Sequence, residues 1–531
     1  MSIKKSLRIS LATSLLSLLL LSLTIAAFAD GSQDRLVAGA EQIDCGTSSW
    51  AVATESDLNG AIDCFNSKSV SGTYTISLTQ SISLTNDTFL HNPTIGVKLN
   101  ILGNKHSFFG HDKWGGTPFR VYEDTDVSVS NLSVILGRSM REDGGGILNS
   151  GTLTLTDSII SGGRAKRGGG IFNTGSLSVI DSRIVRGFAG LGGGIFNSGS
   201  LTVTRSMIYG NYGGFGGAIY DGGIDDVHYI DHGPICVEMS NVGGEVKIFD
   251  SVITGNDSGC GGGVYAKGIL NVVDSSIRSN FADGWGKGGG GIYSVGELEI
   301  IRSTISDNWI SWKGDGGGIY FAGSAMTVDS STISGNRAVG VGGGIYSSGN
   351  SMTLQNSTVS DNSAYIDVEA GYEGDVSGSG GGILSNGALE LIHSTVSENL
   401  AMRLGGGILG GPLTLTNSII ANSRKGGDCI SRNVNFNGIN LVEDNGCGFT
   451  GGRDPKLGRL KNNGGPTLTH ALMDCSPAID AAGSSLATDQ RGVARPEGSA
   501  ADIGAFEYQP DRPFPCPVIQ SIFLPNISSV P

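Results

Sequence analysis

The hydrophobic residues of this 531-residue chain recur in a repeating unit that has no helical periodicity. Each unit starts with Gly-Gly-Gly or Gly-Gly-Ala followed by isoleucine or valine, and the first three intervals between units are 24 residues. Two apolar residues two positions apart follow, such as Leu153 and Leu155, and then a Ser-x-(Ile or Val) element. The residues after the glycine runs are Ile147, Ile171, Ile195, Ile219, Val264, Ile292, Ile319, Ile345, Ile383 and Ile408.

Each unit therefore contains three short strands separated by turns. Such a unit cannot bury its apolar face alone and must stack on its neighbours. The pattern predicts an all-β fold, a parallel β-solenoid with three strands per coil and a period of roughly 24 residues.

An asparagine follows the Ser-x-(Ile or Val) element by three residues in seven units. Asparagines at one position of successive coils can form a hydrogen-bonded ladder, so we interpret them as structural. They are Asn211, Asn256, Asn280, Asn308, Asn336, Asn362 and Asn399.

The two ends of the solenoid need covers, because open strand edges invite association. Ser56 is a candidate N-cap for a helix with Leu58, Ala61, Ile62 and Phe65 on one face. We expect the following organisation: an N-terminal cap at 30–70, the β-helix at 71–427 with insertions at 221–245 and 363–379, a C-terminal cap at 428–508, and a tail at 509–531.

Residues 1–29 have the pattern of a secretory signal peptide. Basic residues precede an apolar run at 11–25, and Ala27-Phe28-Ala29 is a small-x-small cleavage pattern. A run of about 15 residues is too short to span a bilayer, which needs about 20. We expect a secreted or cell-surface protein whose mature chain has no transmembrane helix.

Eight cysteines fit the oxidising compartment that such a signal implies. Proximity along the chain suggests four disulfides, whereas a zinc site would need a Cys-x-x-Cys or a histidine-spaced pair, neither of which occurs. The pairs are Cys45 with Cys64, Cys236 with Cys260, Cys429 with Cys447, and Cys475 with Cys516.

The glycine content and the net charge exclude or disfavour two classes of protein. The 87 glycines have no Gly-X-Y period, which excludes collagen, and the formal net charge of −14 disfavours a nucleic-acid partner because it repels phosphate.

The sequence GGGIFNSGSLTVTRSMIYGN at 192–211 resembles the right-handed parallel β-helix repeats of secreted bacterial proteins. The variant at 216–219 is similar to the repeat of polymorphic outer membrane proteins. Several C-terminal motifs, TDQRGVARP from Thr488 and DIGAFE from Asp502 among them, resemble the choice-of-anchor Q domain. The resemblance implies a right-handed β-helix protein that is secreted or at the bacterial surface, in families with many members of no established activity.

Aromatic residues gather in the turn that varies most between coils. Exposed aromatic rings stack on the apolar faces of sugars, so these residues are candidates for glycan contact. The alternative is that the rings only cover one another and the turn backbone. The candidates are Trp285, Trp309, Trp312, Tyr212 and Phe215.

The two insertions carry weaker candidates. The first, which combines carboxylates with histidines, has the residue types for metal binding or acid–base catalysis, or is a polar loop tied by a disulfide. Its candidates are Asp225, Asp226, His228, Asp231 and His232. The second has acids that can bind calcium, although their spacing matches no standard loop and a solvated acidic turn is the alternative. These acids are Asp367, Glu369, Glu373 and Asp375.

We therefore expect a noncatalytic, adhesin-like or glycan-contacting β-helix protein, with an extracellular glycan or cell-surface partner and no cofactor apart from the calcium candidates. The alternative is a pectate-lyase-like polysaccharide lyase or glycoside hydrolase acting on acidic polysaccharide. The outward positions of the paired apolar strands disfavour it, because they hold no neighbouring carboxylates.

Overall fold

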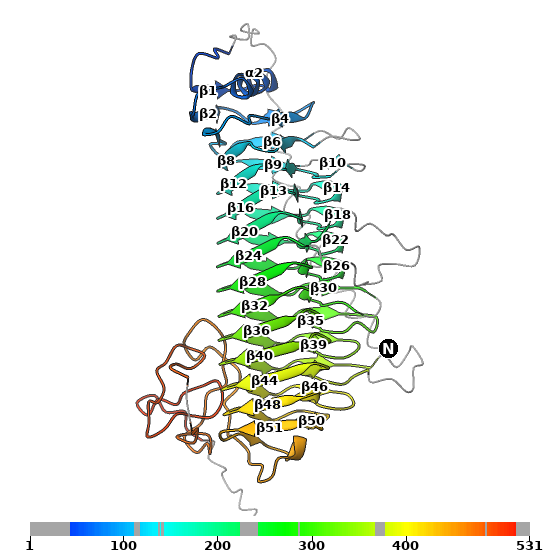
Figure 1. Ribbon diagram of the computed structural model, residues 1–531, viewed down its shortest axis with the longest axis vertical. Helices are drawn as coiled ribbons and strands as arrows, with labels where there is room; N and C mark the ends of the chain where they lie inside the picture. The colour runs from blue at the N-terminus through cyan, green and yellow to red at the C-terminus, as the bar shows by residue number, and fades with distance from the viewer. Residues whose placement is uncertain are drawn as a thin grey trace, which may run out of the picture. The chain divides into compact units, whose positions relative to one another are not determined.

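The computed structural model describes residues 43–110, 117–135, 138–139, 143–223, 243–284, 287–366, 377–483 and 486–516. Within residues 43–516, short parallel strands stack into a right-handed β-solenoid of about 13 turns (Figure 1). The predicted fold class is confirmed.

Each coil crosses the same sheets in the same order. One coil contains β19 (Ile195–Asn197), β20 (Ser200–Thr204), β21 (Met207–Tyr209) and β22 (Tyr212–Phe215). Their stacked equivalents form sheet C, sheet A, sheet B and sheet D, respectively. The first three strands are those predicted, and the fourth lies in the variable turn.

The sheets differ in length. Sheet A runs from β1 (Ser49–Val52) to β51 (Val434–Asn437), sheet B from β3 (Ile82–Ser83) to β52 (Leu441–Val442), and sheet C from β4 (Thr88–Leu90) to β50 (Cys429–Ser431). Sheet D consists of β10 (Arg138–Ser139), β14 (Arg164–Arg167), β18 (Phe188–Leu191), β22, β26 (Asp257–Cys260), β30 (Phe281–Ala282), β34 (Trp309–Ile310), β38 (Arg337–Ala338), β42 (Ser363–Ala364) and β46 (Leu400–Ala401).

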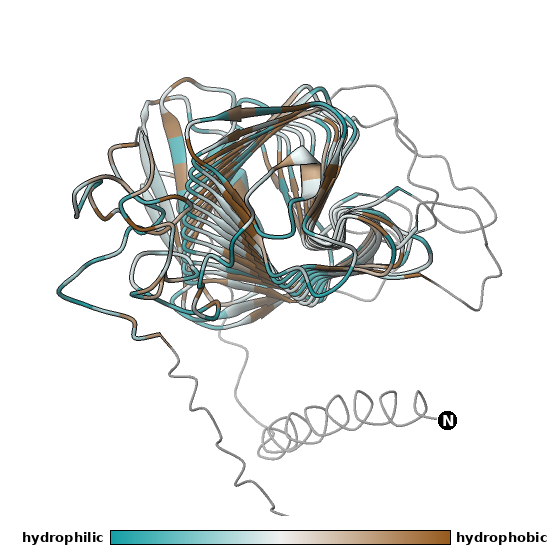
Figure 2. Cartoon of the chain, turned by 90° about the horizontal axis from the view of Figure 1, so that it is seen from below, coloured by the Kyte–Doolittle hydropathy of each residue, from teal (hydrophilic) through white to brown (hydrophobic). Residues whose placement is uncertain are grey.

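The predicted apolar residues line the inside of the coils. Ile195 of β19 pairs with Ile171 and Ile219, and Leu201 and Val203 of β20 are fully buried. The same positions of successive coils make one continuous core. Seen along the stack, the strands of successive coils superpose into its walls (Figure 2).

The seven predicted asparagines form a continuous ladder, as expected. Each Nδ2 atom except that of the last asparagine donates to the Oδ1 atom of the next asparagine over 2.9–3.0 Å. A second donation from Nδ2 goes to a strand carbonyl, as from Asn308 to Ile277 at 3.0 Å. The ladder therefore satisfies the buried polar groups of the corner between sheets B and D.

The serines of the Ser-x-(Ile or Val) elements form a second ladder, which we do not predict from the sequence. Backbone N–H groups donate to the serine Oγ of the next coil, for example Ser275 to Ser303 at 3.0 Å and Ser303 to Ser331 at 3.0 Å. Small hydroxyls here close the corner between sheets A and B without leaving buried donors unpaired.

Helix α2 (Glu55–Asn66) covers the N-terminal end and buries the face predicted from Leu58, Ala61, Ile62 and Phe65. Its N-cap is Thr54 rather than Ser56. The Thr54 hydroxyl accepts the N–H of Asp57 at 3.2 Å, and the Asp57 carboxylate accepts the N–H of Thr54 at 3.0 Å. This reciprocal pair places the N-cap two residues before Ser56.

The solenoid continues past residue 427, where we expected it to end, because β50, β51 and β52 still pair with β47 (Ile408–Gly410), β48 (Leu413–Thr416) and β49 (Ile419–Ala421). The chain then forms what we call the C-terminal module, residues 453–483 and 486–516. It folds back beside the last coils, as the orange and red segments of Figure 1 show.

The C-terminal module docks on the outer face of sheet B. Gln490 Nε2 donates to Thr332 Oγ1 at 2.9 Å, and Gln490 Oε1 accepts from Thr358 Oγ1 at 2.6 Å. Further along, the N–H of Ala505 donates to Thr395 Oγ1 at 3.0 Å. An apolar cluster that joins Ile419 to the module's own core completes the contact.

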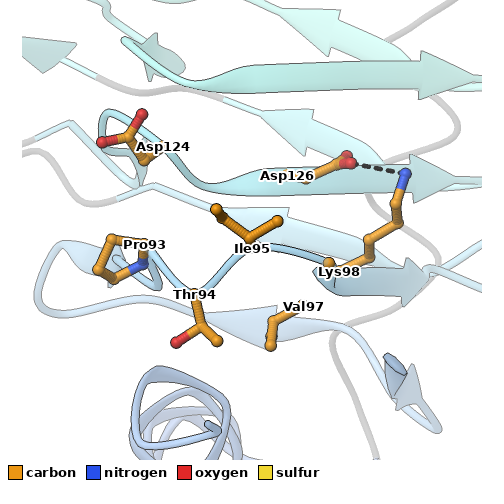
Figure 3. A pocket seen from close by; sticks show the side chains of 8 residues that line it. Pro93, Thr94, Ile95, Val97, Lys98, Asp124 and Asp126 are labelled. Atoms are coloured by element: carbon orange, nitrogen blue, oxygen red, sulfur yellow. Dashed lines mark ion pairs between the residues drawn. The ribbon is translucent and has the colours of Figure 1, made fainter. Parts of the chain in front are cut away.

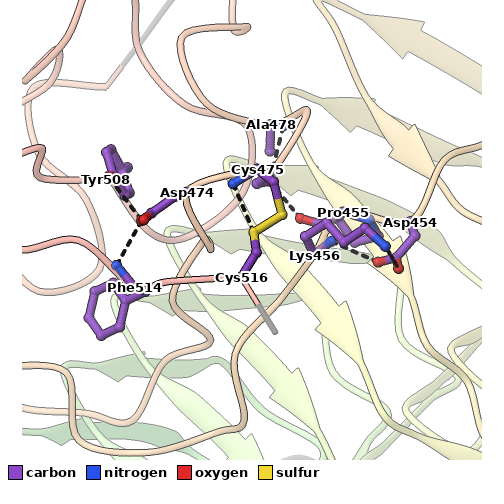
Figure 4. The surroundings of a disulfide bond; sticks show 10 residues. Asp454, Pro455, Lys456, Asp474, Cys475, Ala478, Tyr508, Phe514 and Cys516 are labelled. Carbon is purple, nitrogen blue, oxygen red and sulfur yellow. Dashed lines mark hydrogen bonds and ion pairs between the residues drawn. A yellow bond between two sulfur atoms is a disulfide. The ribbon is translucent and has the colours of Figure 1, made fainter. Parts of the chain in front are cut away.

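Three of the four predicted disulfides are present: Cys45–Cys64, Cys429–Cys447 and Cys475–Cys516. Figure 4 shows the last of these, beside the residues that hold the end of the C-terminal module. Cys260 is also disulfide-bonded, and its predicted partner Cys236 lies outside the described residues.

No helix in the described part of the chain has the length and hydropathy needed to cross a membrane. The predicted signal peptide at 1–29 lies outside that part.

Candidate functional site

Sheet D presents one column of large side chains to solvent, which we call the sheet D column. Side chains alternate along a strand, so from β14 to β38 the first residue of each strand points outward while the second points in and is buried. Parallel pairing aligns these first residues from coil to coil. The sheet D column consists of Arg164, Phe188, Tyr212, Asp257, Phe281, Trp309 and Arg337.

The aromatic residues of the column contact one another and remain accessible. Phe188 stacks on Tyr212 with ring centroids 5.0 Å apart and an interplanar angle of 8°. Phe281 and Trp309 lie 5.0 Å apart at 52°. Tyr212 and Trp309 each keep 48% of their surface exposed. The rings therefore cover part of one another, as the alternative interpretation proposed, yet Tyr212 and Trp309 keep about half of their surface open to a ligand.

Arginines stand at both ends of the column. The Arg164 guanidinium lies 4.2 Å from the centroid of the Phe188 ring, a cation–π contact that holds it against the column. Arg337 is exposed on β38, next to Trp309 in the register.

The asparagine ladder positions the column. In five coils the column residue directly follows a ladder asparagine, as Trp309 follows Asn308 and Phe281 follows Asn280. The asparagine points inward with its hydrogen bonds satisfied, so the next side chain must point outward. A rigid interior thus aligns a row of outward side chains.

Asp257 sits in the middle of the column, between Tyr212 and Phe281 in the register. Burial, and secondly the negative charge of Asp283, raise the pKa of Asp257 to about 6. Asp283 lies one coil further along and accepts a hydrogen bond from the Ser311 hydroxyl. The column therefore holds a carboxyl group that exchanges its proton near neutral pH, beside a second carboxylate.

We predict that Asp257→Asn will be more stable than the natural chain at pH 8 and equally stable at pH 4. The pKa of Asp257 is raised from 3.8, so its contribution to stability is fully present below about pH 4 and is lost as the pH rises through about 6. Because Asp257 is only half-buried, we expect a difference of about 1 kcal/mol at pH 8. Urea unfolding of both proteins at several pH values measures it.

Asp283→Asn is the matched control, because it removes the neighbouring charge and leaves Asp257 in place. It should move the pH at which stability is lost to a lower value. A difference between Asp257→Asn and the natural chain that is the same at pH 4 and pH 8 would contradict the assignment.

The five predicted contact residues do not all lie on one surface. Tyr212 and Trp309 belong to the column, and Trp312, 55% exposed, lies in the turn just after β34. Phe215 packs edge-on against Tyr265 at 5.7 Å, within a buried stack of aromatic residues on sheet C. Trp285 lies outside the described residues.

Sequence reasoning missed Phe188, Asp257 and the two arginines as members of one surface. The signal that could have found most of the column is the position directly after each ladder asparagine. From the sequence alone, we treat that position only as part of the turn that varies between coils.

The catalytic candidates of the first insertion and the calcium candidates of the second all lie outside the described residues. Both remain predictions. They are Asp225, Asp226, His228, Asp231 and His232, and Asp367, Glu369, Glu373 and Asp375. Within the described part of the chain, no three His, Cys, Asp or Glu side chains are arranged to hold a metal ion.

A shallow pocket of about 360 Å³ lies near the N-terminal end, around Ile95, Lys98 and Asp126 (Figure 3). Lys98 and Asp126 form an ion pair across it at 2.8 Å, and both belong to sheet A. The Ile95 side chain at its rim is 96% exposed. Two of its three charged side chains are paired with each other and no aromatic ring lines it, so it is a weaker candidate for ligand binding than the column.

These features define the class of the protein as a right-handed parallel β-solenoid. The family described as "Right handed beta helix region" matches residues 235–409, about a third of the chain. The solved structure of pectate lyase Pel9A is similar over 83% of this chain and 98% of its own, with 11% identity and a TM-score of 0.33. No curated protein matches the chain. The fold class follows from the strands, and the function has to be argued from the site.

Proposed function

We propose that this protein is a noncatalytic, adhesin-like β-helix protein that binds a glycan through the sheet D column. The observation that carries the proposal is the alignment of four aromatic rings in one outward register within five consecutive coils, the middle one of which carries Asp257. Aromatic rings stack on the C–H faces of sugars, while carboxylates and guanidiniums bond their hydroxyl groups. A rigid row of rings supplies these contacts without having to order a loop.

A secreted or cell-surface location is part of the proposal. The predicted signal peptide supports it, and so do the disulfides, which persist in oxidising compartments and are rare in the cytosol.

Trp309→Ala should weaken glycan binding at least tenfold, because a large aromatic ring that a ligand covers commonly contributes more than about 1 kcal/mol. A glycan array run with the mature protein identifies the ligand, and titration calorimetry measures the change. Phe109→Ala, which removes a comparably exposed ring from sheet B, is the control and should bind normally. Equal binding by all three proteins would count against the proposal.

A glycoside hydrolase is the second candidate, because Asp257 and Asp283 place a protonatable carboxyl beside a second carboxylate within the aromatic row. Acid–base cleavage of a glycosidic bond commonly uses two such carboxyl groups. An assay for new reducing ends, run on every glycan that binds, separates the two functions. Product that disappears in Asp257→Asn would establish the enzyme and overturn the noncatalytic proposal.

A further inference from the structure

We propose that the sheet D column binds a single extended polysaccharide chain lying parallel to the solenoid axis, in which acidic sugars alternate with neutral ones. The acidic groups at the two ends would pair with Arg164 and Arg337, and a neutral sugar would lie beside Asp257 between them. This inference rests on the proposed function and names the ligand class of the same site.

The direction of the chain follows from the register. The column residues lie on seven consecutive coils, and stacked strands are about 4.8 Å apart, so Arg164 and Arg337 are about 29 Å apart along the axis. A chain that crossed the solenoid would meet the ring of only one coil. A chain that runs along the axis can place one ring after another beside Phe188, Tyr212, Phe281 and Trp309.

The acidic character follows from the arginines. Arg205, Arg302 and Arg424 on the same solenoid pair with aspartates of other coils at 2.5–2.7 Å. Arg164 and Arg337 are exposed and form no ion pair with any described carboxylate. On a chain of net charge −14, two such cations flanking a row of rings favour an anionic ligand that they can hold by charge-assisted bonds.

We infer a neutral sugar in the middle of the ligand from the positions of Asp257 and Asp283. Both carboxyls lie between the two arginines, so an acidic group at this position would meet the negative charge of Asp283 and, above about pH 6, that of Asp257 as well. Hydroxyl groups of a neutral sugar can instead donate to these carboxylates. A polymer with an acid on every ring therefore fits the column less well than one whose acids are interspersed.

Titration calorimetry at pH 7.5 with three decasaccharides tests the ligand class. The probes are hyaluronan, which alternates glucuronate with N-acetylglucosamine, polygalacturonate, which is acidic at every ring, and a neutral β-1,4-glucan. We expect hyaluronan to bind at least tenfold more tightly than either of the others. Arg164→Gln and Arg337→Gln should each weaken it about fivefold, which corresponds to about 1 kcal/mol. Arg183→Gln, a change to an exposed arginine on sheet B, should leave it unaffected.

Chain length tests the direction. A hyaluronan tetrasaccharide cannot reach both arginines, so it should bind more weakly than the decasaccharide and respond to no more than one of the two substitutions. Equal affinity of the two lengths, or a decasaccharide that is insensitive to both arginines, would overturn the inference.

Failure of the inference and failure of the proposed function look different. If the neutral glucan binds as well as hyaluronan and Trp309→Ala abolishes both, the inference is wrong and the glycan-binding function stands. If no probe binds and no glycan of the array binds either, the proposed glycan-binding function itself is wrong.

Discussion

Asn308→Ala will lower the stability of the solenoid by about 3 kcal/mol or more. The Asn308 side chain is fully buried and makes four hydrogen bonds: its Oδ1 accepts from the N–H and the Nδ2 of Asn280, and its Nδ2 donates to Ile277 and to Asn336. Alanine leaves several of these groups buried and unpaired, and each costs about 1–3 kcal/mol. Urea unfolding followed by circular dichroism measures the loss.

Asn271→Ala is the matched control, since it is the same chemical change on the outer face of sheet A in a neighbouring coil. We expect it to change stability by less than about 0.5 kcal/mol. Hydrogen exchange should further show that Asn308→Ala loses protection first in the adjoining coils, because each coil of a solenoid contacts only its neighbours. Similar stability of the two variants would refute a structural role for the ladder.

Arg495→Ala will unfold the C-terminal module while the solenoid stays folded. The Arg495 side chain is completely buried and donates to Glu507 at 3.0 Å and to the carbonyls of Asp502 and Gly504 at 2.8 and 2.7 Å. Without it the Glu507 carboxylate is buried next to Asp502, a carboxyl whose pKa burial raises to about 7. Removing one partner of a buried pair costs about 3–5 kcal/mol, a large part of the stability of a small module.

Limited proteolysis of the purified variant should cut within residues 453–516 and leave the solenoid coils intact. Arg512→Ala removes an exposed arginine from the same module and should be cut no faster than the natural chain. If Arg495→Ala resists the protease as well as the control does, the module is held mainly by its apolar contacts with sheet B instead.

The solenoid could be predicted because its information is local and repeated. Ile195, Leu201 and Ile208 recur at one spacing in every regular unit, and each points into the core by strand alternation alone. The asparagine ladder was predictable for the same reason, since a single interval of three residues links it to the strand before it. Sequence intervals of 19, 18 and 41 residues also sufficed for three disulfides.

Other features depend on contacts that no local pattern shows. Gln490 meets Thr332, 158 residues earlier, and nothing near either residue indicates the partner. The strands of sheet D near Trp309 are two residues long, too short to show any alternation. The column can be recognised only from the register of seven coils. In the sequence, the insertion between Asp221 and Glu245 hides this register. In the structure, β23 (Ile219–Asp221) still pairs with β27 (Val264–Ala266).

The constant register has an evolutionary consequence. Duplication of one coil, for example the 24 residues from Ile171 to Gly194, would add one rung to the core and one residue to the sheet D column, without creating a new type of junction. Unequal recombination between such repeats can therefore lengthen or shorten the protein in whole coils. Lineages that descend from one ancestor would then differ in the reach of this surface by multiples of about 4.8 Å, while the rest of the architecture stays unchanged.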